Sequence, residues 1–131
     1  ARLTRFQGKI LGISVDEPAD LLAHRIASLA TDTASFIGEE WRFTPEEVLV
    51  VDAYTGSGYA VMGAQEIEAI CMFAQQEALL LDPVYTGRAA AGLIDLIRKG
   101  KFKTSETVLF WHTGGGPALF ASRYQAWLLR D

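Results

Sequence analysis

The sequence predicts an α/β fold in which helices cover the faces of a mainly parallel sheet. Short apolar runs of strand length alternate along the chain with longer segments of helical period. Gly and Pro residues lie at the boundaries, where they end helices and form turns. Half of the 131 residues are hydrophobic and 21% are charged, which suits a single α/β segment over residues 1–131 with a sizeable core.

In the first half of the chain, residues 9–15 are apolar and end at an Asp-Glu-Pro turn, which is typical of a buried strand. A helix is expected from Asp16 or Pro18 to about Ile37, because apolar side chains recur there at helical spacing. Those side chains are Leu22, Ile26, Leu29, Ala30, Thr33 and Phe36. Residues 48–51 predict a second strand, and the close glycines within 54–59 predict a loop after it.

The second half begins with a helix from Ala64 to about Leu79. Another helix starts near Thr86, which could cap it, and Gly100 stops it. Its expected buried face consists of Ala90, Leu93, Ile94 and Ile97. Residues 107–113 predict a third strand, and Pro117 suits the first turn of a last helix over about 117–129. Three strands make a thin sheet, so we expect part of the sheet to lie outside this chain.

Charge and cysteine content exclude several classes of function. Lys and Arg number 12 against 16 for Asp and Glu, a net charge of −4 that argues against nucleic acid or an acidic membrane as partner. Cys71 is the single cysteine, so it can form no internal disulfide, and no metal-ligating cysteine spacing occurs. The sequence contains neither a membrane-length apolar run nor a signal peptide, and a cytoplasmic location is expected.

The carboxyl ends of parallel strands are the usual place for ligands in such folds. Two segments are expected there, 55–59 and 112–116. The glycines at 114–116 would let a flat ligand approach the backbone, and the following helix would direct its amide dipoles to the same place. A tight turn between strand and helix also needs glycine, so this segment alone leaves a ligand site and a plain turn both open.

Tyr59 and Tyr85 lie in loops among small and polar residues. A phenol held against a cation or an imine can serve in general acid–base catalysis. Each tyrosine could instead pack at a helix entrance with its hydroxyl bonded to backbone. His112, at the end of an apolar strand, is by the same reasoning more typical of the core than of a catalyst, and no residues suggest a metal site.

Two longer motifs carry a specific resemblance. They are Leu-Asp-Pro-Val-Tyr-Thr-Gly-Arg-Ala at 81–89 and Phe-Trp-His-Thr-Gly-Gly-Gly-Pro at 110–117. Together they resemble the C-terminal part of the D-cysteine desulfhydrase and 1-aminocyclopropane-1-carboxylate (ACC) deaminase family. These are pyridoxal-phosphate (PLP) enzymes of the tryptophan synthase β fold, and the resemblance extends over essentially the whole chain.

The resemblance implies a two-domain enzyme with PLP between the domains and this chain as the C-terminal part, mostly of the larger domain. Family members are longer, and the lysine that forms the Schiff base and the phosphate-binding glycine loop have no counterpart in residues 1–131. Alone, the chain is therefore not expected to catalyse the family reaction. The full-length protein is expected to be a cytoplasmic homodimer acting on a small amino acid.

Individual roles follow from the same resemblance. Tyr85 matches the tyrosine that stands over the substrate, and Tyr59 matches the second active-site tyrosine, although its Gly-Ser-Gly-Tyr-Ala setting departs from the family's Gly-Pro-x-Tyr-Gly. Thr113 matches the residue whose hydroxyl reaches the pyridine nitrogen of PLP. Thr86 and Gly114 complete the expected cofactor contacts.

Thr86 bears on which activity is expected. ACC deaminases typically have Glu after the motif tyrosine, and their later segment reads His-Leu-Gly-Gly, whereas Thr stands at both places here, at 86 and 113. A carboxylate keeps the ring nitrogen protonated for ring opening, while a hydroxyl suffices for loss of a good thiol leaving group. The resemblance therefore favours conversion of D-cysteine to pyruvate, hydrogen sulfide and ammonia. ACC deaminase and a non-catalytic binding or assembly fragment remain the alternatives.

Overall fold

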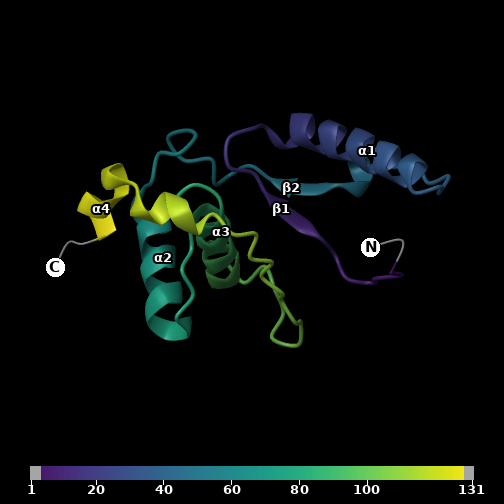
Figure 1. Ribbon diagram of the computed structural model, residues 1–131. Helices are drawn as coiled ribbons and strands as arrows, with labels where there is room; N and C mark the ends of the chain where they lie inside the picture. The colour runs from purple at the N-terminus through teal and green to yellow at the C-terminus, as the bar shows by residue number, and fades with distance from the viewer. Residues whose placement is uncertain (1–3, 129–131) are drawn as a thin grey trace.

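The computed structural model of the protein describes residues 4–128 (Figure 1). Two short strands and four α-helices follow one another, with two 3₁₀ turns between them. In chain order these are β1 (Leu11–Ile13), α1 (Ala19–Phe36), η1 (Pro45–Glu47), β2 (Leu49–Val51), α2 (Ala64–Glu77), α3 (Thr86–Arg98), η2 (Gly116–Phe120) and α4 (Ser122–Leu128). Figure 1 shows α1 lying along the strands, with α2, α3 and α4 gathered beyond one end of them.

The two strands pair in parallel, which confirms the α/β class. Leu11 aligns with Leu49 and Ile13 with Val51, and the Ser14 amide extends the ladder by donating to the Val51 carbonyl over 2.8 Å. Both strands therefore end at the same edge. The segments that leave this edge are residues 14–18, which lead into α1, and the loop at 52–61.

Helix α1 begins where the sequence predicted, but it buries a different face. The Asp52 carboxylate, just after β2, accepts a 2.8 Å bond from the Ala19 amide and so fixes the start of the helix. Ala23, Ala27 and Ala34 are buried because their small side chains let the helix approach the strands closely. Leu29 and Phe36 on the expected apolar face are 65% and 91% exposed.

Helices α2 and α3 pack on each other and form the main core. Ala69 and Ile70 of α2 and Ala90 and Ala91 of α3 are buried there. Leu81, Val84, Met62 and Tyr124 complete the cluster. The expected buried face of α3 is only partly correct: Ala90 is buried, whereas Ile97 is 53% exposed, because the helix inserts its first half, Thr86 to Gly92, into the core.

The third strand predicted at 107–113 is wrong, since the described part of the chain offers no strand beside it. Its side chains nevertheless alternate. Phe110 is half-buried against Phe73 of α2, with ring centroids 5.3 Å apart, while Leu109 and Trp111 on either side are 77% and 78% exposed. Strand-like patterning is present, but the hydrogen-bonded neighbour that defines a strand is missing.

The last predicted helix, about 117–129, is divided. Gly116–Phe120 forms the 3₁₀ turn η2, the backbone is extended at Ala121, and α4 occupies Ser122–Leu128. Residue 129 lies outside the described residues. Among those that are described, no helix is long and apolar enough to cross a membrane.

Candidate functional site

The site is built around the corner that precedes α3, and Asp82 organises it. Its side chain is completely buried. Oδ1 accepts from the amides of Val84 and Tyr85, both over 2.8 Å, and Oδ2 accepts from the amide and the hydroxyl of Thr86, both over 2.7 Å. Burial raises the pKa of Asp82, but these hydrogen bonds outweigh it and hold the pKa below its ordinary value. Asp82 thus fixes the direction in which Tyr85 leaves the corner.

The glycine segment after residue 113 packs against this corner. Gly115 has a φ of +93°, and a Cβ there would stand 2.5 Å from Oδ2 of Asp82. Gly114 has a φ of +99°, and a Cβ on it would meet no atom within 4 Å. The Gly114 carbonyl lies 3.4 Å from the Thr86 hydroxyl, at most a weak second acceptor for the proton that this hydroxyl donates to Asp82. One glycine is therefore required by packing, and its neighbour faces open space.

Tyr59 and Tyr85 meet at this corner although 26 residues separate them. Their hydroxyls share a short hydrogen bond, in which either oxygen can donate. The rings lie edge to face with centroids 6.0 Å apart. Both side chains are about half exposed, at 54% and 47%. The structure therefore presents two linked phenols to solvent at the carboxyl edge of the sheet.

The electrostatics of the pair favour the protonated phenol. The hydrogen bond with Tyr59 is the main cause that raises the pKa of Tyr85, followed by partial burial and by electrostatic interactions with Tyr59 and with the carboxylates of Asp82 and Asp16. A tyrosine is already neutral at ordinary pH, and the raised pKa extends that state to higher pH. A neutral phenol can donate a hydrogen bond or a proton to a group bound beside it, and the second phenol can share that proton.

The other expected site residues differ in burial and in hydrogen bonding. Thr86 is buried, and its hydroxyl both donates to Asp82 Oδ2 and accepts from the Asp82 amide. Thr113 is exposed next to Gly114. The Nδ1 atom of His112 accepts from the Gly114 amide, so its Nε2 is free to donate to the Leu80 carbonyl at 3.2 Å. His112 is therefore held in a structural role, at the surface rather than in the core.

Sequence reasoning missed Arg88 and Glu66. Arg88 is completely buried in α3, and its Nε lies 2.9 Å from Oε1 of Glu66 on α2. Nη1 and Nη2 donate to backbone carbonyls, among them those of Thr55, Gly58 and Val61 in the loop that carries Tyr59. An Arg inside an otherwise apolar and small stretch was the one available signal, because such a charge is rarely buried unless it is paired.

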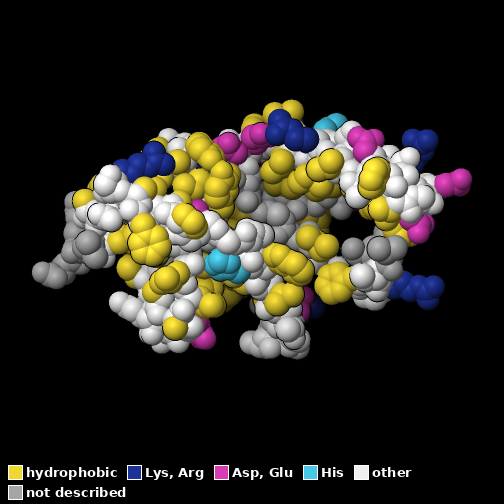
Figure 2. Space-filling model, viewed as in Figure 1, with side chains coloured by type: hydrophobic (Ala, Val, Ile, Leu, Met, Phe, Trp, Pro, Cys, Tyr) yellow, Lys and Arg dark blue, Asp and Glu magenta, His cyan; other side chains and the backbone are white. Residues whose placement is uncertain are grey.

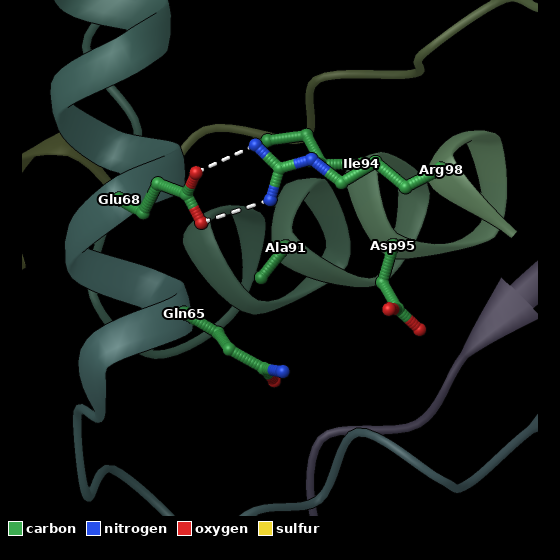
Figure 3. A pocket seen from close by; sticks show the side chains of 6 residues that line it. All are labelled: Gln65, Glu68, Ala91, Ile94, Asp95 and Arg98. Atoms are coloured by element: carbon green, nitrogen blue, oxygen red, sulfur yellow. Dashed lines mark hydrogen bonds and ion pairs between the residues drawn. The ribbon is translucent and has the colours of Figure 1, made fainter.

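A hollow on another side of α2 and α3 is a poor alternative site (Figure 3). Gln65 and Glu68 of α2 and Ala91, Ile94, Asp95 and Arg98 of α3 line about 50 Å³. Arg98 holds Glu68 by two hydrogen bonds of 2.6 and 3.1 Å, and Figure 3 shows the two side chains facing each other. The volume is far below that of ordinary ligand sites, and its arginine is already paired. No cluster of metal-ligating side chains occurs among residues 4–128.

Comparison with known proteins finds a likeness to solved structures. No protein-family model matches the chain. A solved structure described as the ACC deaminase homologue superposes with a TM-score of 0.72 and is 32% identical in sequence. The alignment covers 91% of this chain and 34% of that one, so the chain spans about a third of the length of the protein it resembles. This likeness supports a fold related to part of an ACC deaminase-like protein, and it agrees with the family that the motifs indicate.

Proposed function

We propose that this chain is the C-terminal part of a PLP-dependent enzyme of the ACC deaminase and D-cysteine desulfhydrase family. The observation that carries the proposal is the bonded pair of exposed phenols, Tyr59 and Tyr85, which comes from two distant segments and lies at the carboxyl edge of the parallel strands. The likeness to the ACC deaminase homologue supports the same family.

The residues at the corner fit one wall of a site for a planar aromatic group. Open space stands where a Cβ on Gly114 would lie, so a ring can approach the backbone there. Thr113 offers an exposed hydroxyl next to it, and the tyrosine pair presents its two hydroxyls at the same corner. Thr113 and Gly114 would hold the cofactor ring. When bound, PLP supplies the electron sink that accepts the charge left when the α-proton of an amino acid is removed.

The chain's own residues orient the substrate and handle protons. Tyr85, a neutral phenol at ordinary pH, donates from its hydroxyl to the leaving group or the substrate. Tyr59 shares that proton through the hydroxyl bond between them. The lysine for covalent capture is proposed to come from outside this chain, because Lys99 is paired with Asp95 at the far end of α3 and the other lysines match no family motif.

D-cysteine is the proposed substrate, with pyruvate, hydrogen sulfide and ammonia as products. The argument is that the residue after Tyr85 carries a hydroxyl and no carboxylate. Thr86 stands where ACC deaminases have Glu, and the nearby Asp82 carboxylate already accepts four hydrogen bonds inside the corner. Hydroxyls alone favour a weaker electron sink, which suffices for expelling a thiol. ACC deaminase of the same family is the second candidate, because the solved structure is described as its homologue.

The test uses the full-length natural protein supplied with PLP. We expect equal amounts of pyruvate and sulfide from D-cysteine, at a rate well above ammonia release from ACC. Higher turnover of ACC would reverse the choice between the two activities. No PLP absorbance band and no turnover of either substrate would favour a non-catalytic binding or assembly role.

The tyrosine pair gives a sharper version of this test. Tyr85→Phe and Tyr59→Phe each remove one hydroxyl and keep the ring, so we expect sulfide release to fall by about 100-fold or more, the usual size of a lost acid–base contribution. Tyr54→Phe is the matched control. Its hydroxyl donates to Asp95 over 2.7 Å and takes no part in the pair, so its activity should stay near that of the parent. Equal losses in all three variants would remove the special role of the pair. For the full-length protein we also propose a cytoplasmic homodimer.

A further inference from the structure

Arg88 connects the first turn of α3 to the loop that carries Tyr59. Its side chain is completely buried and donates five hydrogen bonds. Nε donates to Glu66, Nη1 to the carbonyls of Val15, Thr55 and Gly58 at 2.5, 2.9 and 3.1 Å, and Nη2 to that of Val61 at 2.7 Å. Three of these five acceptors belong to the loop at 55–61.

That loop has few bonds of its own. Its internal backbone hydrogen bonds are long, 3.3 Å from the Gly58 amide to Thr55 and 3.4 Å from the Val61 amide to Gly58. Gly56, Gly58 and Ala60 all have left-handed backbone, at φ values of +60°, +123° and +59°. The two glycines adopt this backbone without strain, whereas Ala60 carries a Cβ, so its left-handed backbone persists only when its surroundings hold it. Arg88 shares this task with the Tyr124 hydroxyl, which donates to the Ala60 carbonyl over 2.8 Å, and with the core, against which Ala60 packs.

We infer that Arg88 is a positioning residue, which holds the loop at 55–61 so that the Tyr59 hydroxyl meets the Tyr85 hydroxyl. Tyr85 immediately precedes α3, and Arg88 lies within the first turn of that helix. The guanidinium therefore sets the position of one tyrosine relative to the other. This inference rests on the proposed function only for the importance of the pair.

The alternative role of a buried Arg, binding a substrate carboxylate, does not fit. Its charge is paired with Glu66 at 2.9 Å, its surface is wholly covered, and each of its nitrogens already donates to protein oxygens. The fork geometry of a guanidinium suits several carbonyls at once, which the three donors of a lysine ammonium cannot match in number or direction.

The test replaces the Arg88–Glu66 ion pair and measures the pKa of Tyr85 directly. The double variant E66L/R88M removes both charges and keeps apolar volume, a change that buried pairs often tolerate. In the full-length protein, 3-fluorotyrosine placed at position 85 is titrated by ¹⁹F NMR. Since Tyr59 raises the pKa of Tyr85, release of the loop should lower that pKa toward the value measured in Tyr59→Phe. Turnover should fall by about 100-fold, as expected for a misplaced catalytic group.

The matched control is E68L/R98M, which removes the other Arg–Glu pair between the same two helices. That pair is exposed, and its described bonds reach no loop carbonyl, so the pKa of Tyr85 in this variant should equal that in the parent protein. An unchanged titration in a folded E66L/R88M protein would overturn the inference. If that protein does not fold, Arg88→Lys is tested in its place, because it keeps the positive charge opposite Glu66. We expect the pKa of Tyr85 to fall by a smaller amount in this variant. An unchanged pKa would overturn the inference. The titration needs no turnover, so it stands even if D-cysteine is not a substrate.

Discussion

At the scale of single residues, the three glycines at 114–116 have three different surroundings. Gly115 is left-handed and lies against the Asp82 carboxylate, so a side chain there meets both backbone strain and a clash. Gly114 is left-handed with open space beside it, and Gly116 has neither constraint. A turn accounts for Gly115, while the space beside Gly114 is what a ligand needs.

Substitution by alanine should separate these roles. Gly115→Ala should destabilise the full-length protein by at least about 1 kcal/mol, because the left-handed backbone disfavours a Cβ and the clash with Asp82 adds to this cost. Gly116→Ala is the matched control and should leave the denaturation midpoint nearly unchanged. Urea unfolding measures both, and equal midpoints would show that the Gly115 contact has no energetic weight.

At the scale of the element, α3 depends on the Asp82 side chain for its beginning. Three backbone amides in succession, those of Val84, Tyr85 and Thr86, donate to this one carboxylate. These amides lie just before α3 or at its first residue, where a helix offers them no acceptor. The Asp82 carboxylate, which lies outside the helix, therefore serves as an N-terminal cap. The negative charge of the carboxylate also interacts favourably with the positive end of the α3 dipole.

This arrangement predicts how stability depends on pH. The pKa of Asp82 is lower in the folded protein than in the unfolded chain, so its stabilising effect is fully present above about pH 4, the ordinary range of Asp. It is lost as the pH falls below that range through the folded pKa. Asp82→Asn cannot accept at both positions and should cost about 2 kcal/mol at pH 7.

The difference between the parent and Asp82→Asn, measured by denaturation from pH 7 to pH 3, should shrink as the pH falls. Asp52→Asn serves as the matched control, because this exposed carboxylate makes one described bond to the start of α1. Its cost should be smaller at pH 7. A difference for Asp82→Asn that stayed constant across the range would contradict the assigned cause.

At the scale of the whole molecule, much apolar surface has no cover within the described residues. Figure 2 shows hydrophobic side chains spread over a large part of the face in view. Leu29 and Phe36 of α1 and Leu109 and Trp111 after α3 are among the most exposed. Within residues 4–128 the sheet has two strands, so each of them is an edge strand. Surfaces of this kind usually face another part of a protein.

We therefore expect residues 1–131, prepared alone, to oligomerise or to be poorly stable. Replacing Leu109 and Trp111 by Lys should raise the monomer fraction, because it places charge on the most exposed apolar pair of that segment. The matched control puts the same two lysines at Thr104 and Ser105, which are already polar and exposed. Sedimentation velocity gives the monomer fraction, and a sharp monomeric melting transition of the parent at high dilution would contradict the expectation.

The sequence by itself determined the order of the elements and the position of most of them. The helices at α1, α2 and α3 and the strands at β1 and β2 follow from local periodicity and from Gly and Pro at the boundaries, which act within a few residues. The family resemblance named Tyr85 and Tyr59 as active-site tyrosines, and the structure brings their hydroxyls together. The proposed roles of Thr113 and Gly114 toward a cofactor stay predictions.

Only the tertiary structure decided what depends on distant residues. Whether 107–113 is a strand depends on a neighbour for its backbone, and the face that α1 buries depends on the strands it approaches. The local sequence does not distinguish Arg88 from other residues of a helix. In the structure its five acceptors lie on α2, after β1 and in the loop at 55–61. A buried charge must be paired in space, and no local pattern in the sequence specifies which distant carbonyls will meet it.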